Sequence, residues 1–88
     1  LFRGVALEEG RFGIRSNCVA PGFIDAGLGH ELIAKPGLED WVEGLRKMLP
    51  MKSFGTAEDI AEATIFLLSE KAKYVTGQSL AVDGGLQL

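Results

Sequence analysis

The sequence predicts an α/β fold in which two short parallel strands are joined by helices. Residues 13–20 and 78–82 combine small or β-branched side chains and are bounded by glycine or proline, as strands are. Residues 38–49 and 56–69 repeat apolar side chains at three- and four-residue steps, which is typical of helices. Two short strands joined by a helical crossover are most simply parallel, with a right-handed connection.

The chain is expected to begin with a helix over residues 1–9. Gly10 is its predicted end, because glycine is favoured just past a helix C-terminus. The first strand follows over residues 13–20. It contains Arg15, which a buried parallel strand accommodates only at one end or beside a partner.

Residues 21–37 are expected to form an irregular, mobile segment, because prolines and glycines recur along them. A segment of this length is long for a compact domain, which makes it a candidate for function. An amphipathic helix is predicted over residues 38–49. Its first turn is acidic and its last turn is basic, an arrangement that suits the helix dipole, and Pro50 ends it.

A second amphipathic helix is predicted to begin at the N-cap Thr56, with Asp59 completing a variant of the capping box. Its apolar side chains form a wide face, so we expect this helix to be well buried. The helix ends near Ser69. A turn then leads to the strand over residues 78–82, which closes at residues 83–85.

Composition excludes several classes of protein. With 88 residues, the chain forms at most one small domain. Nine Lys and Arg against twelve Asp and Glu give a net charge of −3, which leaves no basic stripe for nucleic acid. Single residues of cysteine, Cys18, and histidine, His30, rule out a disulfide framework and an ordinary transition-metal site. No signal peptide or membrane-spanning run is recognised, so we expect a cytoplasmic protein without a membrane partner.

The end of the first strand is the most informative position. In open α/β sheets, ligands bind beyond the carboxyl ends of the strands. Pro21 should stop the ladder, and Gly22 lets a flat ligand approach the main chain. The amides of Phe23 and Ile24 are then free to donate to a carboxamide or phosphate. From these residues alone, a simple turn out of the strand is the more frequent meaning of Pro-Gly.

Other local candidates carry less chemistry. His30 next to Glu31 is a possible acid–base pair, although a solvated loop histidine is the simpler interpretation. Cys18 suits a small buried hydrophobe better than a nucleophile. No Gly-x-Ser-x-Gly elbow supports a serine hydrolase. The local chemistry therefore names no reaction.

Four motifs, taken in order, resemble the short-chain dehydrogenase/reductase family. Residues 13–25 read GIRSNCVAPGFID, which is similar to the late strand of that family. Residues 55–61 resemble the start of its next helix, and residues 74–78 and 82–85 resemble its closing strand and tail. The resemblance implies the C-terminal part of a Rossmann-type doubly wound parallel sheet. Residues 1–88 would then be the C-terminal portion of a single NAD(P)-binding domain.

The resemblance also implies a cofactor site. In the family, the Pro-Gly step lies against the nicotinamide ring, and the backbone at the position of Ile24 hydrogen-bonds the carboxamide. Carried over, the cofactor contacts are Pro21, Gly22, Phe23 and Ile24. The family commonly has a cofactor-binding threonine where this chain has Ala26. The missing hydrogen bond would weaken cofactor binding by about 0.5–1.5 kcal/mol.

By the same resemblance, residues 25–49 are the substrate loop and lid. Trp41 and Leu45 are its expected substrate contacts, with core packing as an equally supported alternative. The family's catalytic Tyr-x-x-x-Lys pair does not occur, since Tyr74 is followed at the fourth position by Gln78. That pair, the catalytic serine and the glycine-rich phosphate turn are expected upstream of residue 1, so no residue here is assigned a catalytic role.

Two functions follow from these expectations. The first is the C-terminal segment of an NAD- or NADP-dependent oxidoreductase that acts on a small carbonyl or alcohol substrate by hydride transfer, as a homodimer or homotetramer. The second is a truncated, catalytically inactive oligomerisation or interaction module derived from the same fold. The 88 residues alone are expected to fold poorly, because two parallel strands cannot cover both faces of their sheet.

Overall fold

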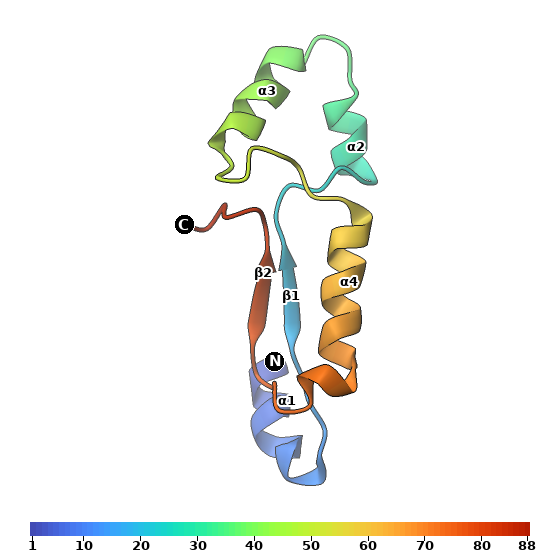
Figure 1. Ribbon diagram of the computed structural model, residues 1–88, viewed down its shortest axis with the longest axis vertical. Helices are drawn as coiled ribbons and strands as arrows, with labels where there is room; N and C mark the ends of the chain where they lie inside the picture. The colour runs from blue at the N-terminus through green and yellow to red at the C-terminus, as the bar shows by residue number, and fades with distance from the viewer.

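Two parallel strands, with one long helix beside them, form the middle of the molecule (Figure 1). The computed structural model describes residues 1–88 and confirms the predicted α/β fold with its helical crossover. The strands pair directly, with Cys18 opposite Ser79. In chain order the elements are α1 (Phe2–Glu9), η1 (Gly10–Phe12), β1 (Cys18–Pro21), α2 (Leu28–Ile33), α3 (Glu39–Met48), α4 (Ala57–Leu68), η2 (Glu70–Ala72) and β2 (Ser79–Val82).

The first strand is shorter than predicted, because it begins at Cys18 instead of residue 13. The residues before it are extended but are held by loop and side-chain hydrogen bonds. The Ser16 carbonyl accepts from the Gly77 amide at 2.8 Å, and Asn17 Oδ1 accepts from the Gln78 amide at 3.0 Å. Side-chain and loop hydrogen bonds thus replace the regular ladder at this end. The second strand begins at Ser79, one residue later than predicted.

Arg15 has the partners that the sequence requires. Its Nη1 donates to the Leu67 carbonyl at 2.6 Å and to the Val75 carbonyl at 3.4 Å, and its Nη2 donates to the Ser69 carbonyl at 3.3 Å. Two of these carbonyls belong to the C-terminal end of α4, where helix carbonyls lack partners within the helix. The guanidinium therefore ties the start of the sheet to the end of α4.

We predict that Arg15→Met lowers the free energy of unfolding of the full-length protein by about 1.5–3 kcal/mol, the range for hydrogen bonds to a charged group. Methionine keeps the apolar stem but cannot donate to the three carbonyls. The unfolding midpoint in urea measures the loss. Arg3→Met is the control, because Arg3 only lies over the ring of its neighbour Phe2. Equal midpoints for the two variants would contradict the tie.

The first helix ends where predicted, at Glu9 with Gly10 as its C-cap, but Gly10 does not take the left-handed conformation typical of such a glycine. Gly10 has a φ of −58° and continues in a right-handed turn through η1. Gly13 instead takes the left-handed conformation, with a φ of 78°, and turns the chain toward β1. Gly10 therefore ends the α-helix, and Gly13 makes the left-handed turn.

The segment over residues 21–37 is not irregular throughout, because it contains α2. Gly29 lies inside this helix, and a side chain there would collide with the Ile24 carbonyl oxygen. This glycine therefore brings α2 against the main chain at the end of β1 instead of breaking the structure.

The last helix has the predicted start but not the predicted burial. Thr56 Oγ1 accepts from the Asp59 amide at 3.2 Å, and the Asp59 carboxylate accepts from the Thr56 amide at 2.8 Å, so the capping box is confirmed. Of its side chains only Leu67 is buried, while Ile65 and Leu68 are exposed. Two strands cover one side of a helix and leave its other apolar side chains in solvent.

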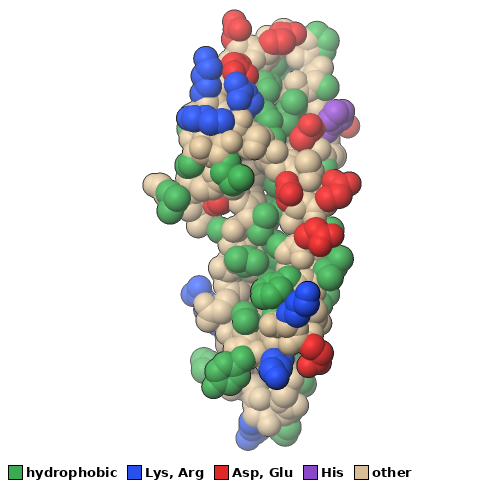
Figure 2. Space-filling view, viewed as in Figure 1, with side chains coloured by type: hydrophobic (Ala, Val, Ile, Leu, Met, Phe, Trp, Pro, Cys, Tyr) green, Lys and Arg blue, Asp and Glu red, His purple; other side chains and the backbone are tan.

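The core is small for the length of the chain. Four of the 88 residues are buried: Ala6, Leu49, Leu67 and Ala72. The accessible surface is 6534 Å², against about 5,000 Å² for a compact monomer of this size. Hydrophobic side chains are spread over the visible face of the molecule (Figure 2). No helix has both the length and the apolar character needed to cross a membrane.

Candidate functional site

The main chain leaves β1 at Pro21, but the ladder continues for one residue. The Gly22 amide donates to the Val82 carbonyl at 3.1 Å. Pro21 was predicted to stop the ladder, but this hydrogen bond forms one residue beyond it. A Cβ atom on Gly22 would lie 2.6 Å from Cβ and 2.8 Å from Cα of Asp83. The glycine is therefore required by a neighbouring residue of this chain, whether or not a ligand approaches it.

The next two amides lack partners. The Phe23 and Ile24 amides donate no hydrogen bond within the chain, whereas the Asp25 amide donates to the Gly55 carbonyl at 2.8 Å. The Phe23 carbonyl in turn accepts from the Gly55 amide at 3.0 Å, which fixes the main chain at this point. Two consecutive N–H groups are thus held in place with their hydrogen-bonding capacity unused.

The residues that carry these amides line an apolar cavity of about 430 Å³. Gly22, Phe23 and Ile24 line one part of it, and Trp41 and Leu45 of α3 line another. The structure thus brings three of the predicted cofactor contacts together with both predicted lid residues. Pro21, the fourth predicted cofactor contact, is exposed and does not line the cavity.

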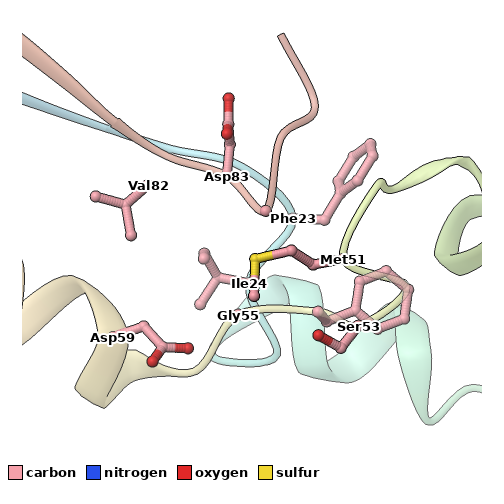
Figure 3. Close-up of a pocket in the computed structure, with 10 residues that line it drawn as sticks. Phe23, Ile24, Met51, Ser53, Gly55, Asp59, Val82 and Asp83 are labelled. Atoms are coloured by element: carbon pink, nitrogen blue, oxygen red, sulfur yellow. The ribbon is translucent and has the colours of Figure 1, made fainter. Parts of the chain in front are cut away.

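A second cavity, of about 260 Å³, is lined in part by the same stretch of main chain (Figure 3). It shares Phe23 and Ile24 with the first cavity and also includes Met51 and Asp83. Asp83 accepts from the Gly85 amide through Oδ1 at 3.0 Å, and its Oδ2 is buried without a partner. Phe23 and Ile24 therefore line both an apolar cavity and a more polar one.

His30 does not pair with Glu31, the alternative that the sequence disfavoured, and its side chain is exposed as expected. His30 Nδ1 lies 2.6 Å from Asp25 Oδ1 instead, and both side chains are largely exposed. Adjacent residues of a helix do not face each other, whereas Asp25 precedes α2 and reaches its first turn. Neither residue of the His30–Asp25 pair lines the apolar cavity.

Two charged residues of α3, Glu43 and Arg46, pair with each other. Arg46 Nε donates to Glu43 Oε2 at 2.9 Å, and Arg46 Nη1 donates to the Lys52 carbonyl at 2.8 Å. The hydrogen bond from Arg46 lowers the pKa of Glu43, and the same bond raises the pKa of Arg46. Figure 2 shows basic side chains gathered at the α3 end of the molecule.

Sequence reasoning missed the wall contributed by α2, namely Leu28, Leu32 and Ile33. The glycines and prolines around them suggested an irregular segment. A signal was nevertheless present, because Leu28 and Leu32 are four residues apart and therefore share a helix face.

Comparison with known proteins relates the chain to a family. A family model described as enoyl-(acyl carrier protein) reductase matches residues 1–87. The 3-oxoacyl-[acyl-carrier-protein] reductase FabG of Buchnera aphidicola is 45% identical over 86 residues, which cover 98% of this chain and 33% of that protein. The peroxisomal 2,4-dienoyl-CoA reductase SPS19 of Saccharomyces cerevisiae is 42% identical over 86 residues, which cover 98% of this chain and 28% of that protein.

Solved structures agree with the sequence comparison. A blue fluorescent protein from a metagenomic library, solved in complex with NADPH, superposes with a TM-score of 0.85 at 36% identity, covering 99% of this chain and 33% of that one. The chain spans about a third of the length of the two curated relatives, 28% of one and 33% of the other. By its family model and its relatives, the chain belongs to the short-chain dehydrogenase/reductase family.

Proposed function

We propose that this chain supplies the nicotinamide end of the cofactor site and the substrate lid of an oxidoreductase that uses NAD or NADP. The reaction is hydride transfer between the cofactor and a carbonyl or alcohol group of a small molecule. The observation that carries the proposal is the pair of unpartnered amides at Phe23 and Ile24, two residues that line an apolar cavity. The reductases among the relatives and the NADPH-bound neighbour support it.

The residues present suit a nicotinamide group. A carboxamide offers the carbonyl acceptor that two adjacent N–H donors lack, and a flat ring suits an apolar cavity beside the end of a strand. Phe23 and Ile24 would hold the carboxamide through their amides, and Gly22, which also lines the cavity, would flank the ring. Bound there, the cofactor supplies or accepts the hydride.

The lid residues act by excluding water. Trp41 and Leu45 form part of an apolar wall at the cavity, and such a wall keeps water from the site where hydride is transferred. No side chain of residues 1–88 is assigned the role of proton donor. Residues 1–88 would therefore bind the nicotinamide and exclude water, and they would not take part in proton transfer.

Titration of the full-length protein with NADH and NADPH, followed by cofactor fluorescence, tests the proposal. We expect Ala26→Thr to lower the cofactor dissociation constant about 2- to 10-fold, because a hydroxyl beside the unpartnered amides adds one hydrogen bond worth about 0.5–1.5 kcal/mol. Ala34→Thr at the exposed end of α2 is the matched control. Failure of the unaltered protein to bind either cofactor would refute the proposal.

An interaction module is the second candidate, and exposed apolar surface favours it. Phe66 and Leu68 of α4 and Leu80 of β2 are 44%, 78% and 38% exposed. The surface in excess of a compact monomer, about 1,500 Å², is about twice the roughly 800 Å² that one partner buries in a standard protein interface. In the oxidoreductase, the same surface would serve a homodimer or homotetramer. A folded oligomer of the 88 residues that ignores NADPH in titration would favour the module.

A further inference from the structure

We propose that the cavity between the end of β1 and helices α2 and α3 selects substrates whose carbonyl or alcohol group is attached to an apolar, uncharged chain. Fatty or alicyclic ketones and alcohols fit this description, and keto acids do not. The inference rests on the proposed function, because the cavity adjoins the two amides assigned to the nicotinamide.

The lining itself carries no charge. Nine of its eleven residues are hydrophobic and the other two are Gly22 and Gly29, so no side chain offers a charged partner. A carboxylate or ammonium group that entered would leave water without gaining a counter-ion or a full set of hydrogen bonds. An apolar chain loses nothing by entering, and it gains in proportion to the apolar area removed from water.

Two of the charged residues next to the lining residues in sequence, Asp25 and Arg46, are already paired elsewhere, and the two without a partner, Glu31 and Asp40, are acidic and would repel a carboxylate. Asp25 follows Ile24 directly, but its carboxylate lies 2.6 Å from His30. Arg46 follows Leu45, but its guanidinium donates to the Glu43 carboxylate and to the Lys52 carbonyl. Neither Asp25 nor Arg46 is therefore available to bind a charged group of the substrate.

The rim of the cavity extends the apolar surface. Leu28 of α2 is 78% exposed and Trp41 of α3 is 52% exposed, although both line the cavity. The absence of a side chain at Gly29 keeps α2 against the Ile24 carbonyl, so this apolar surface begins at the redox site. A chain attached to the carbonyl group would cover these side chains.

Calorimetric binding of two matched ketones to the full-length protein loaded with NADP⁺, which cannot reduce them, tests the inference. The ketones are 2-octanone and 7-oxooctanoate, which have the same length and the same keto position and differ only in a terminal methyl or carboxylate. We expect 2-octanone to bind at least tenfold more tightly. Equal binding, tighter binding of the acid, or binding of neither ketone would overturn the inference.

A charge added to the lining gives a second measurement. Leu45→Arg should reduce the preference for 2-octanone by at least tenfold, because a cation would then face the acid. Gly44→Arg places the same side chain at an exposed position of α3 where nothing lies within 4 Å, and it should leave the preference unchanged. An identical preference in both variants would count against the cavity as the selecting site.

The two proposals fail in different ways. Loss of NADPH binding in the unaltered protein would defeat the cofactor site. Normal NADPH binding without a preference between the ketones would defeat the substrate class alone. If Leu45→Arg does not fold, as circular dichroism would report, the comparison of the two ketones on the unaltered protein still decides. A crystal structure of the full-length protein in which another of its segments fills the cavity would also overturn the inference.

Discussion

A polypeptide that contains only residues 1–88 is expected to unfold without a cooperative thermal transition. Only four of its 88 residues are buried, and its radius of gyration is 16.1 Å, against about 12 Å for a compact domain of that length. Two parallel strands with one covering helix bury too little apolar area to offset the conformational entropy of the chain.

Differential scanning calorimetry of this polypeptide beside the full-length protein measures the effect. The full-length protein should show a heat-absorption peak, and the 88-residue polypeptide should show none at low concentration. A peak that grows with concentration would indicate that self-association covers the exposed apolar side chains. A sharp peak that is independent of concentration would contradict the prediction.

Gly22→Ala is expected to lower the free energy of unfolding of the full-length protein by about 1–3 kcal/mol, the usual cost of overpacking. The added Cβ would lie 2.6 Å from Cβ and 2.8 Å from Cα of Asp83, and neither atom can rotate away. The ends of β1 and β2 must therefore separate. This moves the amides of Phe23 and Ile24, so NADPH affinity should fall as well.

Urea unfolding without cofactor, together with an NADPH titration, separates two causes. Gly44→Ala is the control, because nothing lies within 4 Å of its Cβ and alanine favours a helix by about 1 kcal/mol. If Gly22→Ala lost NADPH affinity while its stability without cofactor stayed unchanged, the added methyl group would meet the ligand and not Asp83. That outcome would favour the sequence-based interpretation of this glycine.

The sequence predicted the parts of the fold that local patterns determine. The helix ending before Pro50 and the capping box of Thr56 and Asp59 follow from periodicity and from hydrogen-bonding chemistry within one turn. Burial of α4 was predicted wrongly for a different reason. Its apolar face is real, but the exposed fraction of Leu68 depends on what lies beyond the two strands, and no local pattern encodes that.

The candidate site divides in the same way. The end of β1 was identified from Pro21 and the residues after it, because the position of a strand end limits where a ligand can bind. The contribution of α2 was missed, since Gly29 looks like a breaker in sequence. It is a point of close approach only once the Ile24 carbonyl is in place beside it. The assignment of Trp41 and Leu45 to the lid stays a proposal, although both line the cavity.

Trp41 is the only tryptophan of the chain, and it lies half-exposed on the wall of the apolar cavity. An indole in that position is an intrinsic optical probe. Its emission wavelength depends on the water around it, and its ultraviolet emission overlaps the absorption of a reduced nicotinamide. Binding of an apolar ligand in the cavity, or of a reduced nicotinamide beside it, can therefore be followed by the fluorescence of Trp41 without a label.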